Sequence, residues 1–288
     1  KMKIRKSFIC VCGLSLALTA FFSSCAENFK PRMTISIPEP ERSFPQPLKI
    51  EPMDESVSLS GRKIVIAPAE EGRTYTLSGY YKGEIHLETK NTVLKLKNAF
   101  LENSSGKPAL YAREKCEISS AKESENYIVS RGRSFMKRGA VDAKKDLILG
   151  GSGGLFIKGT VCHGVEAEDV KMKGSGGFYI EGSRRGSAIS CKSFEAEEKK
   201  AFSAYLLNSK NGIKADKSIN IKSGTFYLYD NSVALKTDIK KDSSKTRRGI
   251  KVSGGVFFIG GNKEFAITDD EGLDFDPASL VDEDNGGE

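Results

Sequence analysis

The sequence predicts an all-β protein folded as a single-stranded parallel β-helix, a solenoid with about 24 residues in each coil. Three observations predict this fold. Apolar residues recur at a fixed interval, apolar and polar residues alternate within short segments, and glycine pairs mark the ends of those segments. The patterns run from residue 56 to residue 268, so most of the chain belongs to one extended domain whose core forms between neighbouring coils.

A fixed interval separates the strongest apolar positions. Val141, Val165, Ile189 and Ile213 follow one another at 24 residues, and Leu235 comes 22 residues later. Each has Ala or Gly directly before it and a small residue two places after it. Equivalent residues of parallel coils stack at about 4.8 Å. We therefore expect these five side chains to form one inward apolar column.

Short strands fill each interval. Three strands fall in one unit, for example at residues 141–143, 147–149 and 155–157. Glycine pairs precede several third strands, where a sharp corner favours positive φ, at residues 153–154, 176–177 and 254–255. A β-sandwich or propeller is the competing fold, but its hairpins use Asn-Gly or Asp-Gly turns. The Asn-Gly pair at residues 211–212 opens a repeat instead, which favours the β-helix.

Composition and charge exclude several classes of function. The chain has 45 basic and 38 acidic residues, a formal net charge of +7. Without the residues before Cys25, 41 basic residues remain against 38 acidic ones, and this net charge of +3 is too small and too evenly spread to indicate nucleic acid. The three later cysteines have no regular spacing, which indicates neither a disulfide framework nor a zinc site. Cys191 takes the place of an alanine in the repeat and is expected to be buried.

The N-terminal end reads as a leader. A basic start precedes an apolar run at residues 8–22, which is typical of a signal peptide and short for a bilayer span. The run ends in Ser-Ser-Cys, which resembles a lipobox. We therefore interpret residues 1–25 as a lipoprotein signal peptide and Cys25 as the residue that carries the lipid, such as palmitate. The prediction is an exported, membrane-anchored lipoprotein at the bacterial cell surface or in the periplasm; simple secretion is the alternative.

Two further segments flank the repeats. Residues 26–55 hold six of the nine prolines, a density that disfavours helix and predicts an extended tether. Residues 269–288 are rich in aspartate and glutamate and are interpreted as an acidic C-terminal tail. Its acidic spacing does not match an EF-hand, so a solvated exit from the β-helix is expected.

Several blocks of the chain resemble one bacterial family. They lie, in order, at residues 74–79, 82–85, 93–98, 104–111, 211–216 and 219–226. Together they are similar to the carbohydrate-binding domain-containing proteins that have a polysaccharide-lyase-like β-helix. The resemblance covers about residues 56–268. It implies a right-handed β-helix, binding of cellulose or acidic sugars, and calcium as a cofactor.

One departure from this family bears on calcium. The family repeat has an acidic pair before its Gly-Ile, but the equivalent positions here read Arg138-Gly139, Cys162-His163, Gly186-Ser187, Lys210-Asn211 and Ser232-Val233. Calcium takes about six to eight oxygen ligands, with carboxylates among them. Neutral and basic residues at these corners weaken the case for calcium and favour an anionic ligand.

Charged residues between the two inward columns are expected to point outward. Down the stack they read Asp142, Glu166, Ser190, Lys214 and Lys236. Lys214 and Lys236 are candidates to bind sugar carboxylates. Asp142 and Glu166 are candidates to share a cation, because stacked carboxylates repel each other unless a positive charge lies between them. A solvated face without a ligand is the alternative.

A second outward ladder and a set of tyrosines add further candidates. Glu168 and Asp216 belong to the second ladder and can help to hold a cation, with alternating surface charge as the other interpretation. The tyrosines Tyr179, Tyr205 and Tyr227 recur on third strands and predict an outward aromatic ladder that suits a flat polysaccharide. Tyrosine is also a favourable residue on any β-sheet surface, which is the alternative.

The sequence offers little support for catalysis. A lyase needs a base and a group that stabilises the enolate, and no acidic cluster accompanies the candidate arginines. No Ser-His-Asp or Cys-His set and no phosphate-binding glycine loop is present in the sequence pattern. The predicted function is non-catalytic binding of polysaccharide, acidic or cellulosic, along an outer face. The protein is expected to be monomeric and lipid-anchored. A polysaccharide lyase and a surface adhesin are the alternatives.

Overall fold

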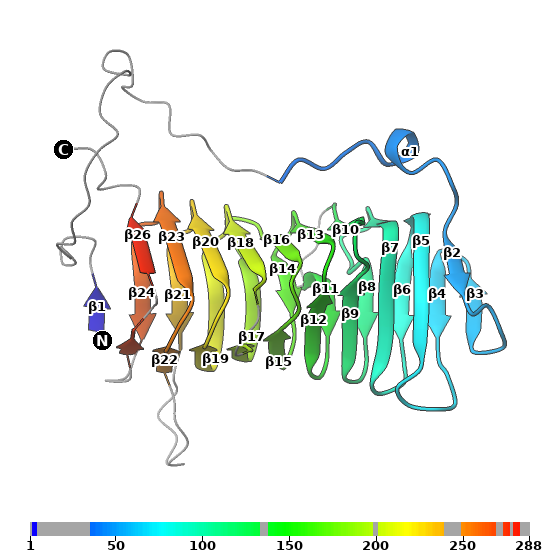
Figure 1. Cartoon of the computed structure of the whole chain (residues 1–288). Coiled ribbons are helices and arrows are strands. Elements are labelled where there is room, and N and C mark those ends of the chain that lie inside the picture. The colour runs from blue at the N-terminus through cyan, green and yellow to red at the C-terminus, as the bar shows by residue number, and fades with distance from the viewer. Residues whose placement is uncertain are drawn as a thin grey trace.

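The computed structural model describes residues 2–4, 35–132, 138–197, 201–238, 249–268, 273–276 and 279–282. Across these ranges the protein is all-β, with α1 (Pro40–Ser43) as the one helix. The strands follow one another along a single axis, from β3 (Val57–Ser60) to β26 (Ser279–Asp282) (Figure 1). Most of them pair in parallel with strands of the preceding and following coils, and they form three rows that we call the first, second and third faces.

The first face is the row that opens each coil, and its strands pair in parallel. Its members are β4 (Lys63–Ile66), β6 (Glu84–Leu87), β8 (Leu110–Ala112), β11 (Gly139–Ala143), β14 (His163–Glu166), the first halves of β17 (Ser187–Ala196) and β19 (Asn211–Ile221), β21 (Val233–Thr237) and β24 (Glu264–Thr268).

The second face follows on each coil and is also parallel. Its members are the first halves of β5 (Thr74–Lys82) and β7 (Thr92–Asn103), β9 (Cys116–Ser120), β12 (Leu147–Gly151), β15 (Asp169–Met172), the second halves of β17 and β19, β22 (Gly249–Val252) and β25 (Leu273–Phe275).

The third face closes each coil with a third set of parallel pairs. Its members are the second halves of β5 and β7, β10 (Glu125–Ser130), β13 (Gly154–Gly159), β16 (Gly177–Glu181), β18 (Ser203–Leu207), β20 (Thr225–Tyr229), β23 (Val256–Gly260) and β26. Antiparallel pairs join β1 (Met2–Ile4) to β24, β2 (Lys49–Glu51) to β5, and β3 to β4.

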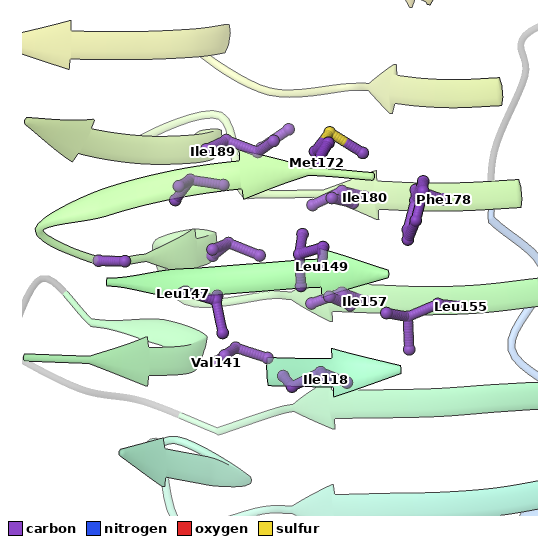
Figure 2. Packing of buried hydrophobic residues seen from close by; sticks show 14 of the residues in the cluster. Ile118, Val141, Leu147, Leu149, Leu155, Ile157, Met172, Phe178, Ile180 and Ile189 are labelled. Atoms are coloured by element: carbon purple, nitrogen blue, oxygen red, sulfur yellow. The ribbon is translucent and has the colours of Figure 1, made fainter. Parts of the chain in front are cut away.

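The predicted apolar column is confirmed. Val141 lies opposite Val165, Val165 opposite Ile189, and the column continues through Ile213 to Leu235. All five side chains are fully buried. Figure 2 shows Val141 and Ile189 among the other apolar side chains that point between the faces. Burial of each such side chain stabilises the fold by about 1.5–3 kcal/mol, which a single coil cannot obtain without its neighbours.

The column also extends beyond the regular repeat, toward the N-terminus. Ile64 pairs with Ile85, Ile85 with Leu110, and Leu110 with Val141. The intervals are 21, 25 and 31 residues, so the first coils differ in length although their strands stay in register. Cys191 is buried as expected, Cys116 and Cys162 are buried as well, and none of the three belongs to a disulfide.

The segment predicted to be a tether differs from that expectation where the structure describes it. Ile35 is 6% exposed and packs with Leu207 and Tyr229, while Phe44 packs on Phe100 further along the stack. The segment therefore lies along the third face, as the blue trace above the strands shows, and ends by pairing β2 with β5 (Figure 1). A short helix forms in spite of the prolines because Pro40 is in its first turn, where no N–H donor is needed.

The acidic C-terminal stretch is also partly ordered into strands. β25 and β26 pair with β22 and β23, so the rows continue into the segment that the sequence suggested was a solvated exit. The alternating Leu273-Asp274-Phe275 pattern accounts for this, since it continues the period of two. In the described residues no helix is long and apolar enough to cross a membrane. Cys25 and most of the predicted signal peptide lie outside the described residues.

Candidate functional site

A pocket lies on the first face, near the N-terminal end of the stack. It has a volume of about 620 Å³, and a smaller one of about 290 Å³ adjoins it and shares Arg62, Glu84 and Lys107. We call the larger pocket the trough. It is lined by Arg62, Lys63, Glu84, His86, Glu88, Lys107, Pro108, Tyr111, Arg113 and Arg138.

Register along the first face builds this trough. Val65 lies opposite His86, and His86 lies opposite Tyr111, because β4, β6 and β8 pair in parallel. The residues on either side of His86 in β6 are fully buried, so the imidazole and the Tyr111 ring point outward. The two rings lie 4.8 Å apart, and the Lys144 ammonium lies 5.9 Å from the Tyr111 ring centre. These contacts form an ordered wall of the trough.

Two glutamates hold several of the trough's polar groups in place. Glu84 Oε1 accepts from Lys107 Nζ at 2.9 Å, and Glu84 Oε2 lies 3.0 Å from His86 Nε2. Glu88 lies 3.7 Å from both His86 Nδ1 and Arg113. Burial acts to raise the pKa of Glu84, but the hydrogen bonds from Lys107 and His86 outweigh it and hold this pKa below its ordinary value.

Arg62 and Lys63 differ from the other cations of the trough. Within the described part of the chain neither side chain forms an ion pair, whereas Lys107, Arg113 and Arg138 each contact a carboxylate. The trough thus carries uncompensated positive charge. An arginine fork and an ammonium next to each other suit a carboxylate or another oxyanion.

Asp142 and Glu166 are brought together, as their stacking predicted. They are opposite each other in β11 and β14. Asp142 is fully buried, so the alternative of a solvated face is wrong at this position. Its carboxylate lies 2.8 Å from Lys144 Nζ and 3.6 Å from Arg138 Nε. These two cations offset the free-energy cost of burying the negative charge. Burial, together with the neighbouring Asp142, raises the pKa of Glu166 to about 7.

The other candidate metal ligands do not join this pair. Glu168 contacts Lys192 at 2.9 Å and Lys145 at 3.5 Å, and Asp216 lies 3.5 Å from Lys214. Among the residues with described positions, no three His, Cys, Asp or Glu side chains gather closely enough to hold a metal ion. Calcium requires several oxygen ligands, whereas Asp142, Glu168 and Asp216 each face lysine or arginine, so the described candidates do not fit a calcium site.

Lys214 and Lys236 face neighbouring carboxylates. Both lie 3.0 Å from Asp238, which receives one ammonium on each oxygen. Burial acts to lower the pKa of Lys214, but the bonds to Asp238 and Asp216 outweigh it and raise the pKa above its ordinary value. These two lysines therefore already have anionic partners within the protein, unlike Arg62 and Lys63.

The predicted tyrosine ladder exists, but on the third face and away from both lysines. Tyr179 and Tyr205 stack at 4.4 Å, Tyr205 and Tyr227 at 4.2 Å, and the planes differ by 7° and 2°. Each ring face is therefore covered by the next ring. The three tyrosines and Ile37 also pack against a small apolar cluster that contains Ile35. Burial raises the pKa of Tyr205 to about 12, with its two tyrosine neighbours adding to the effect. A sugar would meet ring edges and hydroxyl groups here rather than ring faces.

The trough was not predicted from the sequence. Its residues belong to the first coils, which differ in length. No fixed spacing in the sequence therefore indicates that His86 lies opposite Tyr111. The available signal was the alternation of His86 with Ile85 and Leu87, which indicates an outward imidazole but names no partner. The trough adjoins one of the sequence-based candidates, Asp142. Arg138 lines the trough and contacts Asp142, and Lys144 contacts both Asp142 and the ring of Tyr111.

Comparison with known proteins supports the resemblance described above. Residues 60–193 match the sequence model of a family described as carbohydrate-binding domain-containing protein. No curated protein matches the chain. A solved structure with a similar fold is the polysaccharide lyase-like protein from C. thermocellum, in a gadolinium derivative. It has a TM-score of 0.52 and 18% identity, over 80% of this chain and 94% of that one. The expected resemblance to this family is confirmed over the matched residues, and the fold is polysaccharide lyase-like.

Proposed function

We propose that this protein is a non-catalytic carbohydrate-binding protein whose trough binds polysaccharide. The observation that carries the proposal is the position of the trough. Every residue that lines it lies between Arg62 and Arg138, inside the range that matches the carbohydrate-binding family. Tyr205, Lys214, Tyr227 and Lys236 lie outside that range, and Tyr179 lies inside it but is stacked on its neighbours.

An acidic polysaccharide fits the trough better than a cellulosic one. Arg62 and Lys63 have no ion pair among the described residues, and a uronate carboxylate would supply it. We also propose that the chain folds as a right-handed single-stranded parallel β-helix. The three rows of parallel strands and the fold of the polysaccharide lyase-like protein support this proposal.

Removal of the two unpaired cations is expected to weaken binding of acidic polysaccharide. In the double variant Arg62→Gln/Lys63→Gln we expect the Kd for polygalacturonate to rise about 10- to 100-fold, since the two charge-assisted contacts together contribute about 1.4–2.8 kcal/mol. Affinity gel electrophoresis or calorimetry measures it. The matched control is Lys214→Gln/Lys236→Gln, which removes the same charge elsewhere on the first face and should bind as the wild type does. If the control loses binding and the trough variant keeps it, the trough is not the site.

Lyase activity is the alternative function, and one observation favours testing it. His86 is fixed by Glu84 beside the arginines of the trough, an arrangement that can hold a base next to a bound acidic sugar. Incubation with polygalacturonate should release no unsaturated product that absorbs ultraviolet light. Release by the wild type, and its loss in His86→Gln, would replace the binding proposal with an enzyme.

We also propose export and lipid anchoring through Cys25, with the mature protein a monomer held at the bacterial envelope. The support is the basic and apolar leader that ends in Ser-Ser-Cys. Cells expressing the full chain are expected to incorporate labelled palmitate into the wild type and to release Cys25→Ser from the membrane fraction. Equal membrane retention of the two proteins would contradict the anchor.

A further inference from the structure

Exposed cations gather on the turns that join the third face to the first face in the C-terminal half of the stack. They are Arg184, Arg185, Lys210 and Lys263, and within the described residues none of the four forms an ion pair. The turns at residues 182–186, 208–210, 230–232 and 261–263 contain these four cations and one acidic residue, Asp230, a net charge of +3. We call the four cations the basic corner.

Backbone hydrogen bonds stack the turns of the basic corner on one another. Lys210 N donates to Gly186 O at 2.8 Å, in the turn of the preceding coil. Asn231 Oδ1 accepts from Ser209 N at 3.1 Å. Lys263 N donates to Asn231 O at 3.4 Å, which adds the fourth turn. Since neighbouring coils lie about 4.8 Å apart, the basic corner spans about 15 Å along one edge of the molecule.

The N-terminal segment begins its path along the third face directly beside the basic corner. Ile35 packs with Leu207 and Tyr229, and Ile35 N donates to Glu181 Oε2 at 3.4 Å. Glu181, Leu207 and Tyr229 are the last residues of β16, β18 and β20, and turns of the basic corner follow each of them. The chain that precedes Ile35 therefore reaches the folded stack at this edge.

The position of Ile35 limits how far the stack can lie from a lipid on Cys25. Ten residues separate Cys25 from Ile35, and an extended chain of that length spans at most about 36 Å. A free tether made of all thirty residues from 26 to 55 would span about 100 Å. Packing of Ile35 thus keeps the basic corner, rather than the N-terminal end of the stack, nearest to the anchor.

We propose that the basic corner binds the anionic phospholipid headgroups of the membrane that holds the anchor. This inference rests on the proposed lipid anchor at Cys25 and is independent of carbohydrate binding. Exposed arginine and lysine side chains on an outer edge suit a flat surface of phosphates, and each gains about 1 kcal/mol near an anionic membrane. Arg62 and Lys63 of the trough precede β4, five coils from β17 along the first face. At about 24 Å, they lie beyond the range of about 8 Å over which charges act through physiological salt.

Amine acetylation of the lipid-anchored protein in vesicles tests this proposal. The protein is reconstituted into phosphatidylcholine vesicles with or without phosphatidylglycerol, treated briefly with an acetylating reagent and analysed by mass spectrometry. We expect Lys210 and Lys263 to react about 5-fold more slowly when phosphatidylglycerol is present. Lys217 is the internal control, because it is also exposed but lies at the opposite end of the same first-face strand segment, and its rate should not change.

Variants and salt then identify the cause of the protection. Arg184→Gln/Arg185→Gln should lose most of the protection of Lys210, and so should the wild type at high salt. The matched variant Lys122→Gln/Lys217→Gln removes the same charge from other corners of the stack and should keep the protection.

The remaining outcomes overturn separate parts of the account. Equal rates for Lys210 and Lys263 in both kinds of vesicle, with the protein still bound to them, refute the basic corner and leave the anchor in place. Release of the protein from both kinds of vesicle refutes the anchor and the basic corner together. Protection of the two lysines by polygalacturonate, with none from phosphatidylglycerol, would assign this edge to the polysaccharide and not to the membrane.

Discussion

Replacement of Phe226 by alanine is expected to lower the free energy of unfolding by about 3–5 kcal/mol. Phe226 is fully buried between the faces and stacks on Phe257, with ring centres 5.2 Å apart. Phe202 and Phe194 contact it edge-on at 5.7 Å and 6.5 Å. Removal of the ring leaves a cavity that the stacked strands cannot close, because their spacing is fixed by the parallel hydrogen bonds of two neighbouring coils.

Guanidinium unfolding followed by circular dichroism measures this loss. The control is Leu59→Ala, at a side chain that is 66% exposed, and its effect should stay within about 0.5 kcal/mol. A Phe226→Ala protein with wild-type stability would show that the C-terminal coils do not pack as described.

Glu166 is expected to make the protein less stable as the pH rises toward neutrality. Its ordinary pKa is 4.5, and the folded protein raises it to about 7. A carboxyl group with a raised pKa binds its proton more tightly in the folded state, so its contribution to stability is full below about pH 4.5 and is lost as the pH rises through about 7. Because Glu166 is only partly buried, we expect a decline of about 1–3 kcal/mol between pH 5 and pH 8 from this residue.

The variant Glu166→Gln isolates this effect, since glutamine has the same size and does not titrate. Its unfolding free energy should decline less than that of the wild type between about pH 5 and pH 8, and the two proteins should differ most at the alkaline end. Asp142, Arg138 and Lys144 stay in place in both proteins. Parallel pH profiles for wild type and variant would contradict a raised pKa at Glu166.

The strand register was predictable from the sequence because apolar residues recur at one fixed interval. The column from Val141 to Leu235 follows from spacing alone, since parallel stacking leaves equivalent residues no other arrangement. The N-terminal segment was not predictable in the same way. Ile35 and Phe44 are isolated apolar residues among prolines, and nothing periodic indicates that they pack on the third face.

The candidate site was predicted less well, for two physical reasons. Spacing gives the direction of a side chain but not its partners, so Lys214 looked available although Asp238 binds it. Spacing also gives the ladder of Tyr179, Tyr205 and Tyr227 but not the consequence that rings at 4.2–4.4 Å cover one another. The trough lies on coils of unequal length, so no fixed interval in the sequence shows which of its residues lie opposite each other.

Chemical-shift mapping of the folded protein with an acidic oligosaccharide tests the central claim most directly. On titration with oligogalacturonate, the backbone amides of Arg62, Lys63, Glu84, His86 and Tyr111 should shift together, with one saturation curve. Amides on the third face, around Tyr205, should stay unchanged. Shifts centred on the tyrosine ladder or on Lys214 and Lys236, or no shift at saturating ligand, would contradict a polysaccharide site in the trough.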